Sequence, residues 1–231
     1  ASQLEARFLP GQARAIMVEV EGHVLQTGQP GFDTNGNVQT AGNQNQINGA
    51  DHRWVGSDTA NSNRTVGMKD FAKARHSLKK ANVPQTDLVA IVDPSVEFHM
   101  NTLSNLVNVS DNPRWEGIVA DGIATGMKFV KNIYGFDVYT SNFLPEVTDS
   151  ALPERDGSTT NDFSSTAGKA GYFFSAASDV RPWKAAWRQQ PTVDQEWKKD
   201  FQRTEFVTTA RYGSKLYRPE NMVTIVTNPN V

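Results

Sequence analysis

The stretch TVGMKDFAKARHSLKKANVP, residues 65–84, is followed three residues later by the apolar run LVAIVDP, residues 88–94. In the first stretch apolar side chains recur at helical spacing, at Met68, Phe71 and Leu78, and Asn-Val-Pro closes it as helices commonly close. The second is short, continuous and rich in β-branched residues, which is typical of a strand covered on both faces. A helix that leads into a buried strand indicates layers of helix and sheet.

The segments before and after this pair extend the pattern. Helical spacing of apolar residues predicts a helix of about four turns over residues 12–25, after a Pro-Gly pair, and another over residues 94–106. Residues 28–63 are rich in glycine and asparagine and show no sustained period, so we expect a surface loop there. Trp54 and Ile47 are expected to pack part of this loop against the core.

Strands dominate the second half of the sequence. YGFDVYTSNFLPE, residues 134–146, alternates apolar and polar residues and then stops at a proline, which predicts a half-buried strand and a corner. Residues 145–168 are acidic and rich in Ser, Thr and Gly, as in an exposed loop. GYFFSA, residues 171–176, predicts a buried strand. Residues 205–228 predict two strands that form a hairpin around the Arg-Pro-Glu-Asn turn.

Composition limits the classes of protein. The 231 residues carry 12 Phe, 5 Trp and 5 Tyr, enough to build one good core or two small ones. The net charge is -2, so no basic excess points to nucleic acid as the partner. The chain has no cysteine, which excludes disulfides, thiolate metal sites and cysteine nucleophiles. It also has no apolar run of about 18 residues, the length expected of a membrane-spanning helix.

Phosphate and metal sites are weakly represented. GIATGMK, residues 122–128, resembles a phosphate-binding loop in its spacing, but Met127 separates the Gly and Lys that such a loop keeps adjacent, so a glycine-rich turn is preferred. Asp51 beside His52 offers too few metal ligands for a site. Glu97 and His99 lie two positions apart, and on a helix such residues point in different directions.

Catalytic and nucleic-acid sites are no better supported. Ser175 and Ser178 lie in no Gly-x-Ser-x-Gly motif, and no acid and histidine are spaced to form a recognisable triad with them. We therefore assign no catalytic residue, no cofactor-binding residue and no metal ligand, and expect no enzyme. One group of basic and aromatic residues could form a platform for single-stranded nucleic acid: Arg203, Arg211, Tyr212, Lys215, Tyr217 and Arg218. For this group we prefer the interpretation of a solvated strand face.

Three segments together resemble the major capsid proteins of tailed double-stranded DNA bacteriophages, most closely those of short-tailed phages. They are FAKARHSLKKANVPQTDLVAIVDPSVEFHM (71–100), NPRWEGIVADGIATGMKFVKNIYGFDVYTSNFLPE (112–146) and EFVTTARYGSKLYRPENMVTIVTN (205–228). The order of their elements fits as well, and the resemblance covers about residues 12–231. No single motif carries it; the succession of segments does.

The resemblance implies an α+β fold, the HK-ninety-seven-like phage capsid fold, with a long spine helix and with peripheral and axial domains. Residues 1–66 would hold the spine helix and a loop of the peripheral domain, residues 67–180 the axial domain of mixed sheet and helices, and residues 181–231 the strands that return to the peripheral domain. Such proteins are shell subunits without catalytic residues or cofactors. The family usually places an arm and an extended loop before the spine helix, and because this sequence begins almost at that helix, we expect the 231-residue chain to fold but not to build a normal shell alone.

The implied function is a structural major capsid protein that self-assembles, as hexamers and pentamers, into an icosahedral shell around the double-stranded DNA genome. Its expected location is the virion, after assembly in the cytoplasm of the bacterial host. Expected partners are other copies of itself, portal, scaffold or decoration proteins, and non-specifically held DNA, with no membrane partner. Two alternatives remain open: an encapsulin-type nanocompartment shell protein, and a nucleic-acid-binding module that uses the basic carboxy-terminal segment.

Charge is distributed unevenly along the chain. Residues 145–162 contain five acids and one arginine, whereas residues 181–218 contain nine Lys or Arg and four acids. In a repeating shell the acidic loop of one subunit could meet the basic segment of the next, where complementary charge fixes register. Packaged DNA is the competing partner for the basic segment. If the inter-subunit contact is the correct one, we expect reversal of Lys198 and Lys199 to Glu to impair the assembly of DNA-free shells, most strongly at low salt.

Overall fold

The computed structural model describes residues 2–28, 46–56, 64–102, 132–148, 152–155, 160–161 and 167–230. The chain divides into two compact units, which share the sequence in an interleaved way. The smaller unit takes residues 1–27 and 183–217, and the larger unit takes residues 28–182 and 218–231. The chain therefore crosses between the units three times.

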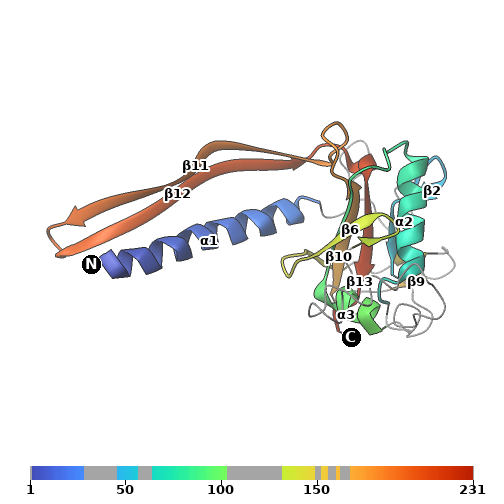
Figure 1. The fold of residues 1–231 in the computed structure, drawn as a ribbon, viewed down its shortest axis with the longest axis horizontal. Coiled ribbons are helices and arrows are strands. Elements are labelled where there is room, and N and C mark those ends of the chain that lie inside the picture. The colour runs from blue at the N-terminus through green and yellow to red at the C-terminus, as the bar shows by residue number, and fades with distance from the viewer. Residues whose placement is uncertain are drawn as a thin grey trace. The chain divides into compact units, whose positions relative to one another are not determined.

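The smaller unit consists of one long helix and one long hairpin. Helix α1 (Ser2–Gln26) runs alongside the hairpin of β11 (Trp183–Lys198) and β12 (Arg203–Leu216) (Figure 1). The predicted helix over residues 12–25 is thus confirmed but starts ten residues earlier, and Pro10 lies inside it. The preceding residues Leu4 to Leu9 are mostly good helix formers, and a single internal proline removes one backbone hydrogen bond without necessarily ending the helix.

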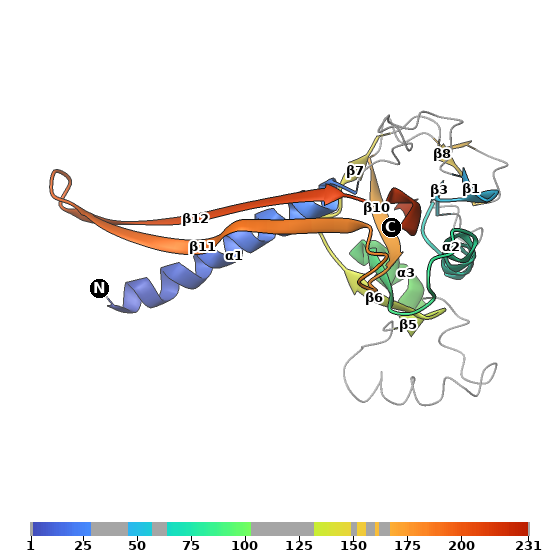
Figure 2. The ribbon, with the colours of Figure 1, turned by 90° about the horizontal axis from the view of Figure 1, so that it is seen from above.

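The larger unit is organised around a seven-stranded mixed sheet, seen from above in Figure 2. Its main order is β3 (Arg53–Val55), β13 (Met222–Thr227), β10 (Gly168–Ser175), β4 (Leu88–Val92), β6 (Phe136–Thr140) and β5 (Asn132–Ile133), and β7 (Glu146–Val147) also pairs with β10. The pairs β3–β13 and β4–β6 are parallel, and the others are antiparallel. Two small ladders accompany the sheet: β1 (Gln46–Ile47) with β2 (Ala50–Asp51), and β8 (Leu152–Pro153) with β9 (Thr160–Asn161).

Helices α2 (Met68–Lys80) and α3 (Pro94–Thr102) contribute to the core with one face of this sheet. Phe71 of α2, Phe136 of β6 and Phe173 of β10 are fully buried and meet edge to face, with ring centroids 5.0–6.2 Å apart. Such aromatic geometry adds to the free energy gained from burying the rings alone. The three rings therefore join helix and sheet at the centre of the larger unit.

The central predicted elements are confirmed. Helix α2, strand β4, strand β6 and the buried strand at GYFFSA, now β10, all form where the patterns indicate. On β4 the side chains alternate between buried and half-buried, so the strand is less completely covered than its apolar run predicts. Helix α3 begins at the predicted Pro94, and the end of its predicted range lies outside the described residues.

Two predictions about loops and strands are wrong. The loop expected at residues 28–63 is interrupted by β3, which pairs with β13 inside the main sheet. The expected packing of Trp54 against the core is confirmed, since Trp54 is fully buried in the core cluster, while the side chain of Ile47 lies outside the described residues. The hairpin expected within residues 205–228 does not form. Strand β12 pairs with β11, β13 pairs with β10 and β3, and the Arg-Pro-Glu-Asn segment holds the short 3-10 helix η3 (Pro219–Asn221).

The two compact units interleave along the sequence, whereas the predicted domains follow one another, so the two divisions differ at two points. Residues 181–231 were grouped as returning strands, but residues 218–231 belong to the larger unit, where β13 occupies an interior position of the sheet. Residues 28–66 likewise belong to the larger unit and not with α1. The reason is the same in both places: β3 and β13 are short strands with buried side chains, β3 pairs with β13, and β13 pairs with β10.

We expect replacement of Gly56 by alanine to destabilise the larger unit by about 1–3 kcal/mol, the range for overpacking. An added Cβ would lie 2.6 Å from the backbone nitrogen of Val66, and the Gly56 amide already donates to the Val226 carbonyl at 2.8 Å, so neither backbone can withdraw freely. Gly213→Ala is the matched control, since no heavy atom outside its neighbours lies within 4 Å of its added Cβ. Equilibrium urea unfolding of both variants measures the effect, and equal stabilities would contradict it.

Candidate assembly surface

The hairpin β11–β12 has two chemically different faces, and α1 contacts one of them. On β12 the even-numbered residues face the helix: Thr208 donates a 2.8 Å hydrogen bond to Gln12, and Ser214 lies 3.2 Å from His23 Nδ1. The His23 ring meets the edge of Tyr212 at a centroid distance of 5.5 Å. We call this side the helix face and the opposite side the outer face.

Large apolar side chains on the helix face remain exposed. Trp187, Val193 and Trp197 of β11 are 41%, 45% and 57% exposed, and their cross-strand partners are all even-numbered residues of β12. Trp187 and its partner Tyr212 have ring centroids 5.4 Å apart. A two-stranded ribbon is rarely stable by itself in water, so a hairpin of this length with exposed tryptophans is suited to burial by further protein.

Charged side chains gather on the outer face, and near the hairpin turn they neutralise one another. Glu205 pairs with Lys198 across the strands at 2.7 Å and with Arg203 on its own strand. The hydrogen bond to Glu205 raises the pKa of Lys198, and the hydrogen bonds from Lys198 and then Arg203 lower the pKa of Glu205. Both groups are therefore charged across the neutral range.

At the other end of the outer face the charges are all positive. Lys184 and Lys215 are directly opposite each other on neighbouring strands. Arg211 precedes Lys215 by four residues on β12 and therefore lies on the same face. The Lys184 ammonium lies 3.8 Å from the centre of the Tyr217 ring, a cation–π contact that leaves its charge in place. We call Lys184, Arg211 and Lys215 the basic row.

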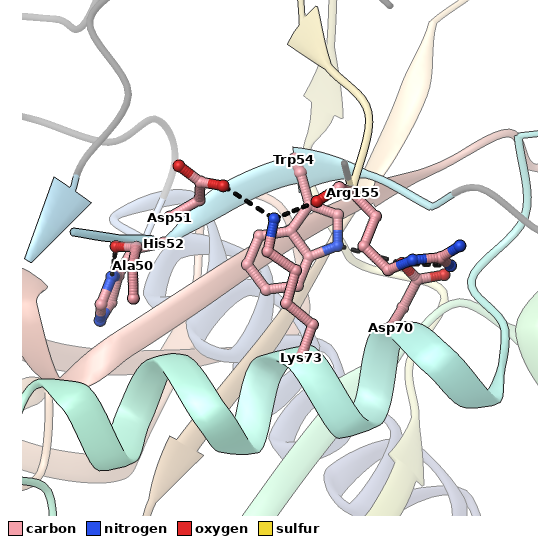
Figure 3. Close-up of polar contacts among 7 residues, drawn as sticks. All are labelled: Ala50, Asp51, His52, Trp54, Asp70, Lys73 and Arg155. Atoms are coloured by element: carbon pink, nitrogen blue, oxygen red, sulfur yellow. Dashed lines mark hydrogen bonds and ion pairs between the residues drawn. The ribbon is translucent and has the colours of Figure 1, made fainter. Parts of the chain in front are cut away.

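A cluster of charged groups in the larger unit is structural (Figure 3). The buried carboxylate of Asp70 accepts hydrogen bonds from the Trp54 indole at 3.1 Å and from the Gly67 amide at 2.9 Å, and it pairs with Arg155 at 3.4 Å. Lys73, one turn along α2, pairs with Asp51 at 2.7 Å and donates to the Arg155 carbonyl. We call these five side chains and Gly67 the Asp70 clamp.

The Asp70 clamp ties three separate segments together: α2, the β2–β3 segment, and the residues after β8. Its charges are matched inside the group, two carboxylates against Lys73 and Arg155. In each of these contacts a donor of the cluster meets an acceptor of the same cluster, as expected of a group that holds packing in place. It is not arranged like a nucleophile with its base.

Among the described residues, the candidate metal ligands are not brought together. His52 is buried, with Nδ1 3.0 Å from the Ala50 carbonyl, while its neighbour Asp51 pairs with Lys73. His99 is buried and Glu97 half-buried on α3. Among the residues that the structure describes, no group of three or more His, Asp or Glu could hold a metal ion. Residues 122–128 lie outside the described residues.

The serine and tyrosine hydroxyls that could be considered for catalysis have structural surroundings. Ser175 donates to the Thr86 carbonyl at 2.8 Å, and Ser178 donates to Asp179 at 3.0 Å. Burial raises the pKa of Tyr172 far above its ordinary range, against a smaller opposite effect of Arg53. Tyr172 is therefore a neutral phenol at physiological pH and not a base.

The predicted basic and aromatic group is divided by the structure. Arg203 is engaged with Glu205, and Arg218 belongs to the larger unit, where its guanidinium donates to the Asp179 carbonyl at 2.8 Å. Tyr212 faces the helix. Only Arg211, Lys215 and Tyr217 remain on the exposed outer face, and sequence reasoning missed their neighbour Lys184. The position of Lys184 opposite Lys215 follows from the pairing register of β11 and β12, and two irregularities in β11 shift that register along the hairpin.

Within the described part of the chain, no helix has the length and apolar character needed to cross a membrane.

Solved phage structures share this fold. A structure from Mycobacterium phage Che8 matches 94% of this chain with 17% identity and a TM-score of 0.60, and the capsid structure of the cyanophage P-SCSP1u matches 98% with 19% identity and a TM-score of 0.59. The mature capsid of bacteriophage PhiM1 matches 100% with 12% identity and a TM-score of 0.57. The chain spans 61–65% of the length of these solved chains. No protein-family description matches the sequence. No curated protein matches it.

The described chain thus has the mixed α+β fold seen in phage capsid structures, as its resemblance to that family implies. The likeness extends over both units, because the matches cover 94–100% of the chain. At identities of 12–19% it establishes the fold, and the role of the protein has to be argued from its surfaces.

Proposed function

We propose that this protein is a structural shell subunit, the major capsid protein of a phage of the short-tailed type, and that it encloses double-stranded DNA without catalysing a reaction. The observation that carries the proposal is the fold match across both units, at TM-scores of 0.57–0.60 to three phage structures, two of which are capsids by description. The exposed tryptophans of the hairpin support it, because a shell subunit must bury its surface against further copies.

Within this proposal the smaller unit serves as the peripheral domain, with α1 as the spine helix and β11–β12 as its sheet. The larger unit serves as the axial domain. The boundaries of these domains then follow the two units. Residues 183–217 belong to the peripheral domain, although the sequence on both sides of them belongs to the axial domain. The Asp70 clamp and the three packed rings of Phe71, Phe136 and Phe173 keep the axial domain rigid, as a repeated structural plate requires.

The proposed partners are further copies of the same chain in hexamers and pentamers, portal, scaffold or decoration proteins, and DNA held without sequence preference. The proposed location is the virion, reached after assembly in the host cytoplasm. An encapsulin-type shell would use the same subunit contacts but would enclose protein cargo, so the content of the particle separates these two roles.

The test is electron microscopy of protein expressed from its complete gene and purified at high concentration, with sedimentation velocity of the same sample. We expect five- and six-fold oligomers or closed particles of uniform diameter. Particles that contain enzyme cargo would favour the nanocompartment role. A monomer at every concentration, with duplex DNA affinity that falls steeply as salt rises, would contradict the shell and favour a nucleic-acid-binding module.

A further inference from the structure

The outer face of the hairpin carries an imbalance of charge that the hairpin itself does not resolve. Near the turn, Glu205 and the directly opposed Glu196 balance Lys198 and Arg203. In the basic row the described residues of the hairpin place no carboxylate: Lys184 and Lys215 oppose each other, and Arg211 is on the same side of β12. One face of one ribbon is therefore neutralised at one end and purely cationic at the other.

This arrangement works against the isolated hairpin. Like charges directly opposite each other on neighbouring strands repel, and the position is destabilising unless a counter-charge approaches. Lys184 and Lys215 are both exposed, and among the described residues neither forms an ion pair with a carboxylate. An acidic surface that binds the basic row would offset the repulsion between Lys184 and Lys215 by attracting both side chains.

A second copy of the chain supplies an excess of negative charge on its larger unit. The smaller unit carries nine Lys or Arg against seven Asp or Glu, a net charge of +2, while the larger unit carries 14 against 18, a net charge of -4. Copies that associate head to tail place unlike surfaces in contact, as in any heterologous ring or shell contact. Complementary charge at such contacts sets register and speeds encounter.

We infer that the basic row, Lys184, Arg211 and Lys215, is a docking surface for the acidic larger unit of a second copy of this chain. The inference rests on the proposed shell and adds which face of the hairpin meets the neighbouring subunit. It also changes the residues expected to matter: Lys198, named from the sequence alone, already pairs with Glu205 and does not belong to the docking surface.

The test compares two double variants that change the net charge equally. Lys184→Glu with Lys215→Glu reverses the basic row, and Lys69→Glu with Lys79→Glu reverses two exposed lysines of α2 on the larger unit. Light scattering and sedimentation of protein from the complete gene measure association in about 50 mM and about 500 mM salt. We expect the basic-row variant to associate at least about tenfold more weakly at low salt, with the difference shrinking at high salt as screening increases. The α2 variant is expected to associate as well as the wild type or better.

A second measurement locates the contact directly. Carbodiimide joins an amine to a carboxylate only where they touch, and a mixture of nitrogen-14 and nitrogen-15 chains distinguishes links between copies from links within one copy. We expect mixed-isotope peptides that join Lys184 or Lys215 to carboxylates of the larger unit. Particles without such links would overturn this inference and leave the shell proposal standing, whereas the absence of any oligomer would overturn both.

Packaged DNA is the other polyanion that could cover the basic row, and the same variants separate it. If the basic-row variant forms wild-type particles at both salt concentrations but loses affinity for a 30-base-pair duplex, relative to the α2 variant, the row contacts nucleic acid and the inference is wrong.

Discussion

Phe173→Ala is expected to lower the free energy of unfolding of the larger unit by about 3–5 kcal/mol, the cost of removing a large aromatic side chain from a packed core. The ring is fully buried and lies 5.0 Å from Phe71 and 5.5 Å from Phe136, centre to centre. Its loss leaves a cavity and also removes two edge-to-face contacts. Because a small domain is stable by only about 5–15 kcal/mol, a loss of this size consumes much of the stability of the unit.

The measurement is chemical denaturation together with amide exchange of strands β4, β10 and β13, which belong to the larger unit. Phe98→Ala is the control, since Phe98 is 60% exposed on α3 and its removal leaves no cavity. Phe173→Leu should fall between them, because it keeps apolar volume but not the ring edges. A Phe173→Ala protein that exchanges as slowly as the Phe98→Ala protein would contradict the proposed centre of the core.

Asp70→Ala is expected to have an effect of similar size, about 3–5 kcal/mol, for an electrostatic reason. The substitution leaves the buried Trp54 indole and the Gly67 amide without their acceptor and removes one ion pair of Arg155. It also removes the side chain that caps the start of α2, since Gly67 is the N-cap residue and has no side chain to offer.

A graded series distinguishes the loss of charge from the loss of hydrogen bonds. In Asp70→Asn the amide has one acceptor oxygen, so either Trp54 or Gly67 loses its bond, and we expect a smaller loss of roughly 1–3 kcal/mol. Asp137→Ala is the surface control, because Asp137 is exposed on β6 and its side-chain bond to Asn132 is exposed too. Chemical denaturation with amide exchange of helix α2 reports on the clamp itself. Equal unfolding midpoints for Asp70→Ala and Asp137→Ala would refute its structural role.

The elements that sequence predicts well are those whose signals are local. Helix α2 has its apolar period, its acidic first turn and its Asn-Val-Pro ending within one stretch, and β6 shows its alternation within five residues. Strand β3 has only three residues inside a glycine- and asparagine-rich context, and its partner β13 lies far along the chain. Nothing near Trp54 indicates that distant pairing.

The hairpin shows why the pairing of strands was harder to predict than their existence. The Arg-Pro-Glu-Asn segment has turn-forming residues, yet the chain reverses between Lys198 and Arg203. There Gln202 takes a positive φ of 48° and its amide donates to the Lys199 carbonyl at 3.3 Å. Positive φ is usually signalled by glycine or asparagine, so glutamine gives no warning of the turn. Without the turn, neither the Lys198–Glu205 pair nor the basic row can be derived.

The interleaving of the two units has a consequence for how such a chain can change in evolution. Strands β10 and β13 are antiparallel neighbours in the sheet. Residues 183–217 lie between these strands in the sequence but belong to the smaller unit. The two ends of this excursion are held together where the Arg218 amide donates to the Pro182 carbonyl at 3.1 Å. The cost of closing a loop grows slowly with its length once its ends are fixed. The hairpin is thus an insertion whose two ends are fixed in the larger unit, so its length and outer face can diverge between lineages while the strands of the sheet keep their register.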